Sequence, residues 1–157
     1  MKTHYRSYRL KEHGHFIVSQ AGQVILFAGE GPWNEDALCR WEREMGDMIC
    51  SIDKTKPWAQ LSLLYGDSLM IPSAFERFIT GTIERKSLGL SALGIVIKDS
   101  EITSLIKNQL VEVYKQAEIE YAFFERIEEA LLWLRNQNFE ISEEDIHLFL
   151  STSNFSR

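Results

Sequence analysis

Residues 91–124 read SALGIVIKDSEITSLIKNQLVEVYKQAEIEYAFF, and this stretch decides the fold class. Its first part, residues 92–97, is a continuous apolar run of the kind found in buried strands. Asp99 and Ser100 then open a helix whose apolar residues recur every three or four positions and form one buried stripe: Ile102, Leu105, Ile106, Leu110, Val113 and Ala117. Residues 121–124 follow as a short strand. Strand, helix and strand in this order predict two parallel strands joined by a right-handed crossover.

The same alternation extends towards the N-terminus. Residues 58–65 predict another strand, followed by an amphipathic helix that ends near Gly89. The apolar face expected for that helix contains Phe75, Phe78, Ile79 and Ile83. Further upstream, Asn34 is the expected N-cap of a helix whose apolar face contains Leu38, Trp41, Met45, Met48, Ile49 and Ile52. The domain begins with three short strands, at residues 8–12, 15–19 and 24–28.

The C-terminal part of the chain adds a closing helix and an extension. The closing helix is indicated by four apolar residues, Ile127, Ala130, Leu131 and Leu134. Ser142, with Asp145 three residues later, predicts the cap of a short further helix that ends near Leu150. We therefore divide the chain into a single domain, residues 1–139, and a C-terminal helical extension with a frayed tail, residues 140–157. The extension covers its own domain or reaches across a homodimer, and we expect the dimer because the segment follows the element that normally completes the fold.

Together these elements predict an α/β fold with a mixed β-sheet of about five to six strands and crossover helices packed on it. Hydrophobic residues make up 45% and charged residues 25% of the 157 residues, which is the usual composition of one folded domain. The formal net charge of -6 disfavours contact with phosphate backbones, so we expect no nucleic acid partner. The chain shows no signal peptide and no apolar stretch near the ~18 residues of a membrane helix. We therefore expect a cytoplasmic protein without a transmembrane segment.

Two short motifs resemble a known family. Residues 124–134, FERIEEALLWL, are similar to the closing strand-to-helix pattern of the SpoIIAA-like fold, which STAS domains share with a bacterial family of SpoIIAA-like proteins of unknown function. Residues 29–33, before the first helix, match more weakly, and Arg126 stands where a small capping residue is usual. The resemblance spans roughly residues 8–137. It implies the SpoIIAA-like fold and, more loosely, a regulatory or protein-interaction module, since fold alone does not determine function.

The resemblance also points to one serine. In the STAS antagonists of anti-sigma factors, a serine at the start of the second helix is a phosphorylation switch, and Ser73 is the best matching position here. Pro72 replaces the acidic residue that precedes the family's serine, and the glycine that follows it is not there. Ser73 and Glu76 also have the spacing of a capping box, in which each side chain bonds a backbone N–H. We expect this structural role and keep the phosphoswitch as the alternative.

The sequence offers no catalytic residue that can be named. It has no GxSxG turn, no CxxC pair and no glycine-rich phosphate loop, so we expect no enzyme. An enzyme whose catalytic groups converge from distant positions stays a third alternative. His13 and His15 would share one face of a strand but have no third ligand nearby, so we expect exposed imidazoles, no metal and no cofactor. Cys39 and Cys50 fall close to the apolar stripe of one helix, roughly 16 Å apart along its axis, which excludes a disulfide between them.

Aromatic residues indicate a candidate pocket. Trp33, Phe75 and Phe78 flank loops that follow predicted strands, where open α/β sheets place their ligand crevices. These rings either close the core or, with Ile79, line a pocket for a small apolar or lipid-like ligand, as in the Sec14-like proteins that the chain also resembles. Our first expectation is a non-enzymatic module that acts through a protein partner or self-association. Binding of such a ligand is the alternative.

Overall fold

The computed structural model describes residues 14–153 of the chain. Its centre is a five-stranded sheet with the strand order β1-β2-β3-β4-β5. β1 and β2 are antiparallel, and all other neighbours are parallel, so the sheet is mixed. The strands are β1 (His15–Ala21), β2 (Val24–Glu30), β3 (Trp58–Tyr65), β4 (Leu90–Lys98) and β5 (Glu120–Phe124).

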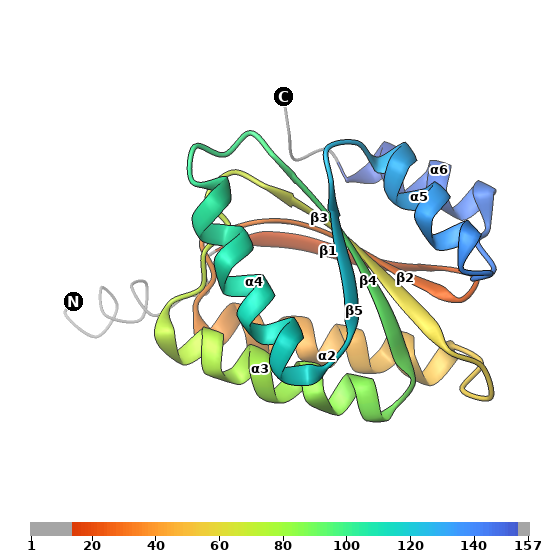
Figure 1. Cartoon of the computed structure of the whole chain (residues 1–157), viewed down its shortest axis with the longest axis horizontal. Helices are drawn as coiled ribbons and strands as arrows, with labels where there is room; N and C mark the ends of the chain where they lie inside the picture. The colour runs from red at the N-terminus through yellow and green to blue at the C-terminus, as the bar shows by residue number, and fades with distance from the viewer. Residues whose placement is uncertain (1–13, 154–157) are drawn as a thin grey trace, which may run out of the picture.

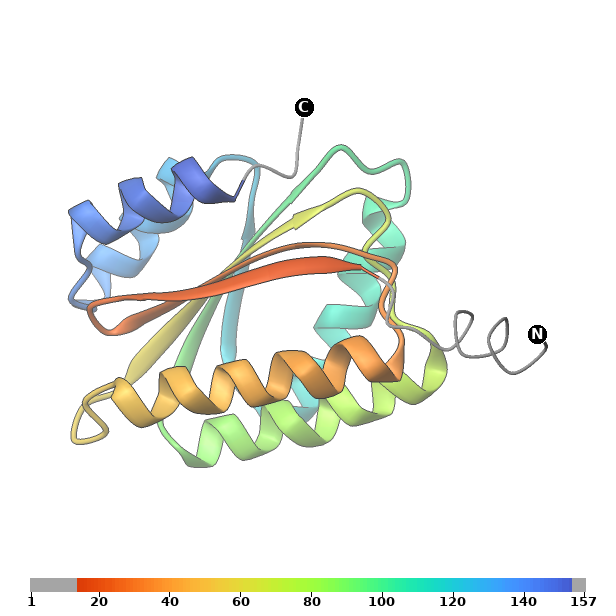
Figure 2. The ribbon, with the colours of Figure 1, turned by 180° about the vertical axis from the view of Figure 1, so that it is seen from behind.

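One helix connects each pair of parallel neighbours, and these three helices cover the same face of the sheet (Figure 1). They are α2 (Glu35–Ser51), α3 (Pro72–Ser87) and α4 (Thr103–Ala117). Each crossover leads to the next strand in the same direction across the sheet. When such crossovers all have the same hand, their helices lie on one face of the sheet. The opposite face carries α5 (Ile127–Asn136) and α6 (Glu143–Thr152), as Figure 2 shows from behind. The fold therefore has three layers, with a core on each side of the sheet.

The central strand, β3, brings polar side chains into the larger core. β3 lies between β2 and β4, and its first seven residues are buried. Because side chains alternate along a strand, Leu61 and Leu63 face the core under α5 and α6, while Gln60 and Ser62 face α2, α3 and α4. Two polar side chains of the sheet thus lie in the middle of this layer.

The structure confirms the α/β class, the mixed sheet and several element boundaries. The strand predicted at residues 58–65 is β3. Asn34 caps α2, because its Oδ1 accepts a hydrogen bond of 3.0 Å from the N–H of Ala37. Ser142 likewise caps α6 by accepting a hydrogen bond of 3.2 Å from the N–H of Asp145. The strand predicted at residues 8–12 lies outside the described residues.

The capping box predicted at the start of α3 is wrong. The helix begins at Pro72, with Ile71 in the cap position, and no side-chain hydrogen bond caps it. Ser73 and Glu76 therefore both lie inside the helix and form no capping box. Proline is favoured at the first helical position because its fixed φ suits the helix and its missing N–H has no partner there anyway. Because of this preference, α3 begins at Pro72, one residue before Ser73.

The C-terminal extension packs on its own domain. Ile146 and Phe149 of α6 are buried in the core on that face of the sheet. In the turn between β1 and β2, the N–H of Gln23 donates a hydrogen bond of 2.8 Å to the carbonyl of Glu140. Gly22 of this turn has a φ of +71°, and a Cβ there would come within 2.5 Å of the Glu140 carbonyl oxygen, so the contact requires glycine. Of the two arrangements expected for this segment, the single chain adopts the one that covers its own sheet.

Candidate functional site

Three residues of α3 depart from the usual relation between polarity and burial. Thr82 and Arg85 are buried, with 0% and 5% of their surface exposed. Ile83 is 46% exposed, so the prediction that it faces the core is wrong. Phe75 and Ile79 are only partly buried, at the margin of the core. A helix that buries polar residues and exposes apolar ones departs from the amphipathic pattern, and such departures are expected at functional surfaces.

Phe75, Ile79 and Ile83 form an apolar stripe along α3. Each step of four residues turns this stripe by about 40° around the helix, from the junction with α4 towards solvent. At the junction lies a groove of about 520 Å³, lined by Leu69, Phe75, Leu105, Asn108, Gln109 and Glu112. Leu105, predicted to lie in the buried stripe of α4, is instead 54% exposed. We call this groove, together with Ile71, Ile79 and Ile83, the α3/α4 surface.

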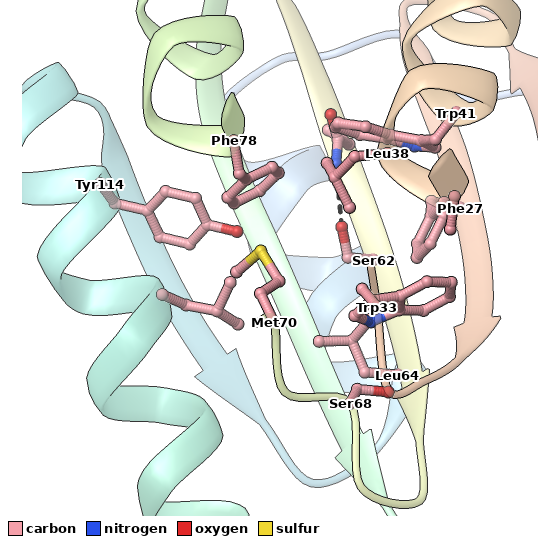
Figure 3. A pocket seen from close by; sticks show the side chains of 13 residues that line it. Phe27, Trp33, Leu38, Trp41, Ser62, Leu64, Ser68, Met70, Phe78 and Tyr114 are labelled. Carbon is pink, nitrogen blue, oxygen red and sulfur yellow. Dashed lines mark hydrogen bonds between the residues drawn. The ribbon is translucent and has the colours of Figure 1, made fainter. Parts of the chain in front are cut away.

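A separate cavity lies between the sheet and α2, α3 and α4 (Figure 3). Its volume is about 50 Å³. Trp33 and Phe78, two of the four residues predicted to line a pocket, both line it. Phe75 and Ile79, the other two, do not, because the turn of α3 directs them towards the α3/α4 surface. The four predicted residues therefore do not share one pocket.

Polar atoms from β3 and α2 are buried around this cavity. Nε2 of Gln60 donates a hydrogen bond of 3.0 Å to the hydroxyl of Ser62, the dashed line in Figure 3. Oε1 of the same amide has no hydrogen-bond partner among the described residues, and neither has the indole Nε1–H of Trp41. Leaving a buried donor or acceptor unpaired costs about 1–3 kcal/mol. Gln60 and Ser62 are not among the candidates predicted from the sequence, although two polar residues at a spacing of two within an apolar strand are a readable signal.

A buried cation lies beside the cavity. The guanidinium of Arg85 stacks on the rings of Trp41 at 4.4 Å and Phe78 at 5.5 Å, and its Nη2 donates a hydrogen bond of 2.9 Å to the Thr82 hydroxyl. Burial lowers the pKa of Arg85 to about 10, so the side chain is still charged at neutral pH. Burial raises the pKa of Tyr114, whose hydroxyl therefore stays protonated. That hydroxyl points towards the cavity (Figure 3).

A short segment at the start of α3 joins the cavity to the α3/α4 surface. On one side, the N–H of Trp33 donates to the carbonyl of Leu69 at 2.8 Å, and the N–H of Ile71 donates to the carbonyl of Trp33 at 3.1 Å. On the other side, the side-chain amide of Gln109 bonds both the N–H of Met70, at 3.0 Å, and its carbonyl, at 2.9 Å. Met70 lines the cavity and Leu69 lines the groove. Consecutive residues of one fixed segment therefore contact both sites.

Ser73 is exposed on the side of α3 that faces α2, not α4. It lines a shallow depression with Arg77 and four carboxylates: Glu35, Glu42, Glu76 and Glu84. Arg77 is paired with two of them, Glu42 at 2.8 Å and Glu35 at 3.7 Å. A phosphate on Ser73 would be favoured by the start of the helix and disfavoured by the carboxylates. The phosphoswitch stays a prediction.

Other candidate chemistry is sparse in the described part of the chain. Residues 14–153 contain no group of three or more His, Cys, Asp or Glu side chains that could hold a metal ion. His13 lies outside this range, and His15 is exposed. Cys39 and Cys50 of α2 are free thiols, and Cys50 is exposed rather than close to the apolar stripe. Within the same range, no helix has the length and apolar character needed to cross a membrane.

Comparisons with known proteins assign no family to this chain. No protein-family model matches the sequence, and neither a curated protein nor a solved structure gives a significant match. The resemblance to SpoIIAA-like and STAS proteins therefore stays a prediction. The geometry of the α3/α4 surface and of the cavity is the basis for any functional conclusion.

Proposed function

We propose that the chain is a non-enzymatic regulatory module that binds another protein through the α3/α4 surface. The exposed side chain of Ile83 carries this proposal, because the same part of α3 buries two polar residues, Thr82 and Arg85, in its place. Exposed apolar side chains that cluster mark sites of association. Covering Ile71, Ile83 and Leu105 would gain about 25 cal/mol for each Å² of apolar surface removed from water. The SpoIIAA-like resemblance supports the same class of function.

The partner that suits this surface is an amphipathic helix with basic residues at its edges. A groove between two helices accepts a third helix whose apolar side chains recur every three or four positions. Phe75, Ile79 and Ile83 offer a stripe with that spacing. Glu112, in the groove, adds negative charge to a chain whose formal net charge is already -6. Lys or Arg residues beside the apolar face of the partner helix would be attracted.

Binding of a lipid-like molecule, the alternative expectation, has less support. The cavity measures about 50 Å³, whereas pockets for drug-sized ligands measure about 300–1,000 Å³. Phe75 and Ile79 also lie outside the cavity. A lipid chain would require a several-fold larger space than the helices leave here.

Site-specific photocrosslinking in the cells that make the protein tests the proposed interaction. A photoreactive amino acid at position 83 should crosslink one specific protein. The same group at position 148 should not, because Leu148 is 64% exposed but lies on α6, across the sheet. With the purified partner, Ile83→Asp should weaken binding at least about tenfold, and the matched control Leu148→Asp should change it less than about twofold.

Three results would contradict the proposal. Equal crosslinking from positions 83 and 148 would mean that the α3/α4 surface is not selective. Unchanged affinity of the Ile83→Asp variant would place the contact elsewhere. A crosslink only between two copies of the chain would replace the partner helix by self-association.

A further inference from the structure

The cavity contains two polar atoms that the folded chain leaves unpaired. Oε1 of Gln60 and Nε1–H of Trp41 are buried and have no hydrogen-bond partner within residues 14–153. Both residues line the cavity, and they are 2% and 5% exposed. Native proteins pair almost all such atoms with protein, water or ligand. The two atoms therefore indicate that something occupies the cavity.

The hydrogen bonds already formed narrow the chemistry of this occupant. The hydroxyl of Ser68, which also lines the cavity, accepts from the N–H of Gly31 at 3.1 Å and donates to the carbonyl of Tyr65 at 2.9 Å. Ser68 is thus satisfied. What remains is an N–H on Trp41 that needs an acceptor, a carbonyl on Gln60 that needs a donor, and the Tyr114 hydroxyl, which points towards the cavity (Figure 3) and can act as either. The occupant must supply both an acceptor and a donor.

The walls of the cavity are uncharged. None of the residues that line it is Asp, Glu, Lys, Arg or His. Arg85 stacks on Trp41 and Phe78 without lining the cavity. A cation moved here from water would find no opposite charge on the walls, and an anion would find only the Arg85 guanidinium, which does not contact the cavity, so both are unfavourable. The aromatic and aliphatic side chains suit a short hydrocarbon chain instead.

We infer that the cavity binds a small neutral molecule with a short apolar chain and a group that both donates and accepts hydrogen bonds, such as a primary amide. A volume of about 50 Å³ leaves space for roughly four or five non-hydrogen atoms. Met70 lines the cavity and is 8% exposed, and its unbranched side chain can adapt to the shape of the molecule. No described residue lines both this cavity and the groove of the α3/α4 surface, so ligand binding here can be tested independently of the proposed protein partner.

NMR titration of the full chain tests this site with three probes that share the propionyl group: propionamide, propionate and 2-butanone. The indole N–H resonance of Trp41 reports on the cavity. Trp58 gives a control in the same spectra, because it is buried and its Nε1–H already donates a hydrogen bond of 2.9 Å to the carbonyl of Leu88. Propionamide should shift the Trp41 resonance saturably, with a dissociation constant of about 1–10 mM for so few atoms, and leave Trp58 unmoved.

The other two probes and the Gln60→Leu variant test which charge and which hydrogen bonds the cavity recognises. Charged propionate should bind at least about tenfold more weakly than propionamide. 2-Butanone, which accepts but cannot donate, should also bind more weakly. Gln60→Leu should lower the affinity for propionamide to that for 2-butanone and leave 2-butanone binding unchanged, because leucine cannot accept a hydrogen bond.

Three results would contradict the inferred ligand site. Equal binding of propionate and propionamide, or unchanged propionamide affinity in the Gln60→Leu variant, would overturn the assigned recognition. If no probe moves the Trp41 resonance saturably, the cavity holds water only and the inference is wrong.

Discussion

Replacing Gln60 by leucine and Ser62 by alanine should stabilise the ligand-free protein. Gln60 is 2% exposed, and its Oε1 has no partner in the described chain, an arrangement that costs about 1–3 kcal/mol. Leucine has a similar size and no polar atom. The substitution also removes the 3.0 Å hydrogen bond from Nε2 to Ser62, which contributes about 0.5–1.5 kcal/mol. With Ser62→Ala in the same variant, so that no buried hydroxyl loses its partner, the difference favours leucine by about 1 kcal/mol, which corresponds to a rise in Tm of about 2–4 °C for a chain of this length.

Urea unfolding followed by circular dichroism measures this change, and Gln23 provides a matched control. Gln23 is 6% exposed, but its amide is fully used: Nε2 donates to the carbonyls of Asp53 and Pro57, both at 3.1 Å, and Oε1 accepts from the N–H of Asp53 at 3.3 Å. Gln23→Leu should therefore lower the free energy of unfolding by about 2–4 kcal/mol. A loss of more than about 1 kcal/mol in Gln60→Leu/Ser62→Ala would mean that Oε1 has a partner in the ligand-free protein, and would refute the reasoning about the unpaired amide.

Further expectations concern α3 and one surface carboxylate. Phe78→Ala should lower the free energy of unfolding by about 3–5 kcal/mol, because Phe78 is buried between Trp41 and Tyr114, with ring-centroid distances of 5.5 and 6.4 Å. Phe75→Ala should cost less than about 2 kcal/mol, and equal losses in urea unfolding would contradict the different burial of the two rings. Ile83→Ser should change the free energy of unfolding by less than about 0.5 kcal/mol, since the side chain is 46% exposed, and a large loss would place Ile83 in the core. The pKa of Asp53 should lie below 3.8, because hydrogen bonds from the Thr55 hydroxyl and N–H favour the carboxylate. Its stabilising effect should be complete above the unfolded-state pKa and disappear as the pH falls through the lower folded-state pKa. NMR titration should show the pKa of Asp53 returning towards 3.8 in Thr55→Ala, and an unchanged pKa would contradict this cause.

The arrangement of strands and helices could be predicted because hydrophobic periodicity reports burial directly. Residues 92–97 form a continuous apolar run because β4 is covered on both faces by helices. The cap at Asn34 could be predicted because it depends on local chemistry alone. The cap at Ser73 could not, because Pro72 competes for the same helix start.

The orientation of α3 depends on tertiary packing, which the sequence pattern does not resolve. Phe75, Phe78, Ile79 and Ile83 span an arc of about 140° around the helix. Only part of that arc faces the sheet, and contacts with α2 and α4 select the part that contains Phe78. The cavity could not be predicted from the sequence for a similar reason. Gln60 and Trp41 line the same cavity only because β3 and α2 pack together.

Native mass spectrometry of the protein purified gently from the cells that make it tests most directly whether the α3/α4 surface binds a partner. We predict a stoichiometric complex with a different protein that is retained in Leu148→Asp and lost in Ile83→Asp. A wild-type chain that is recovered as a bare monomer, or a complex that Ile83→Asp leaves intact, would contradict this conclusion.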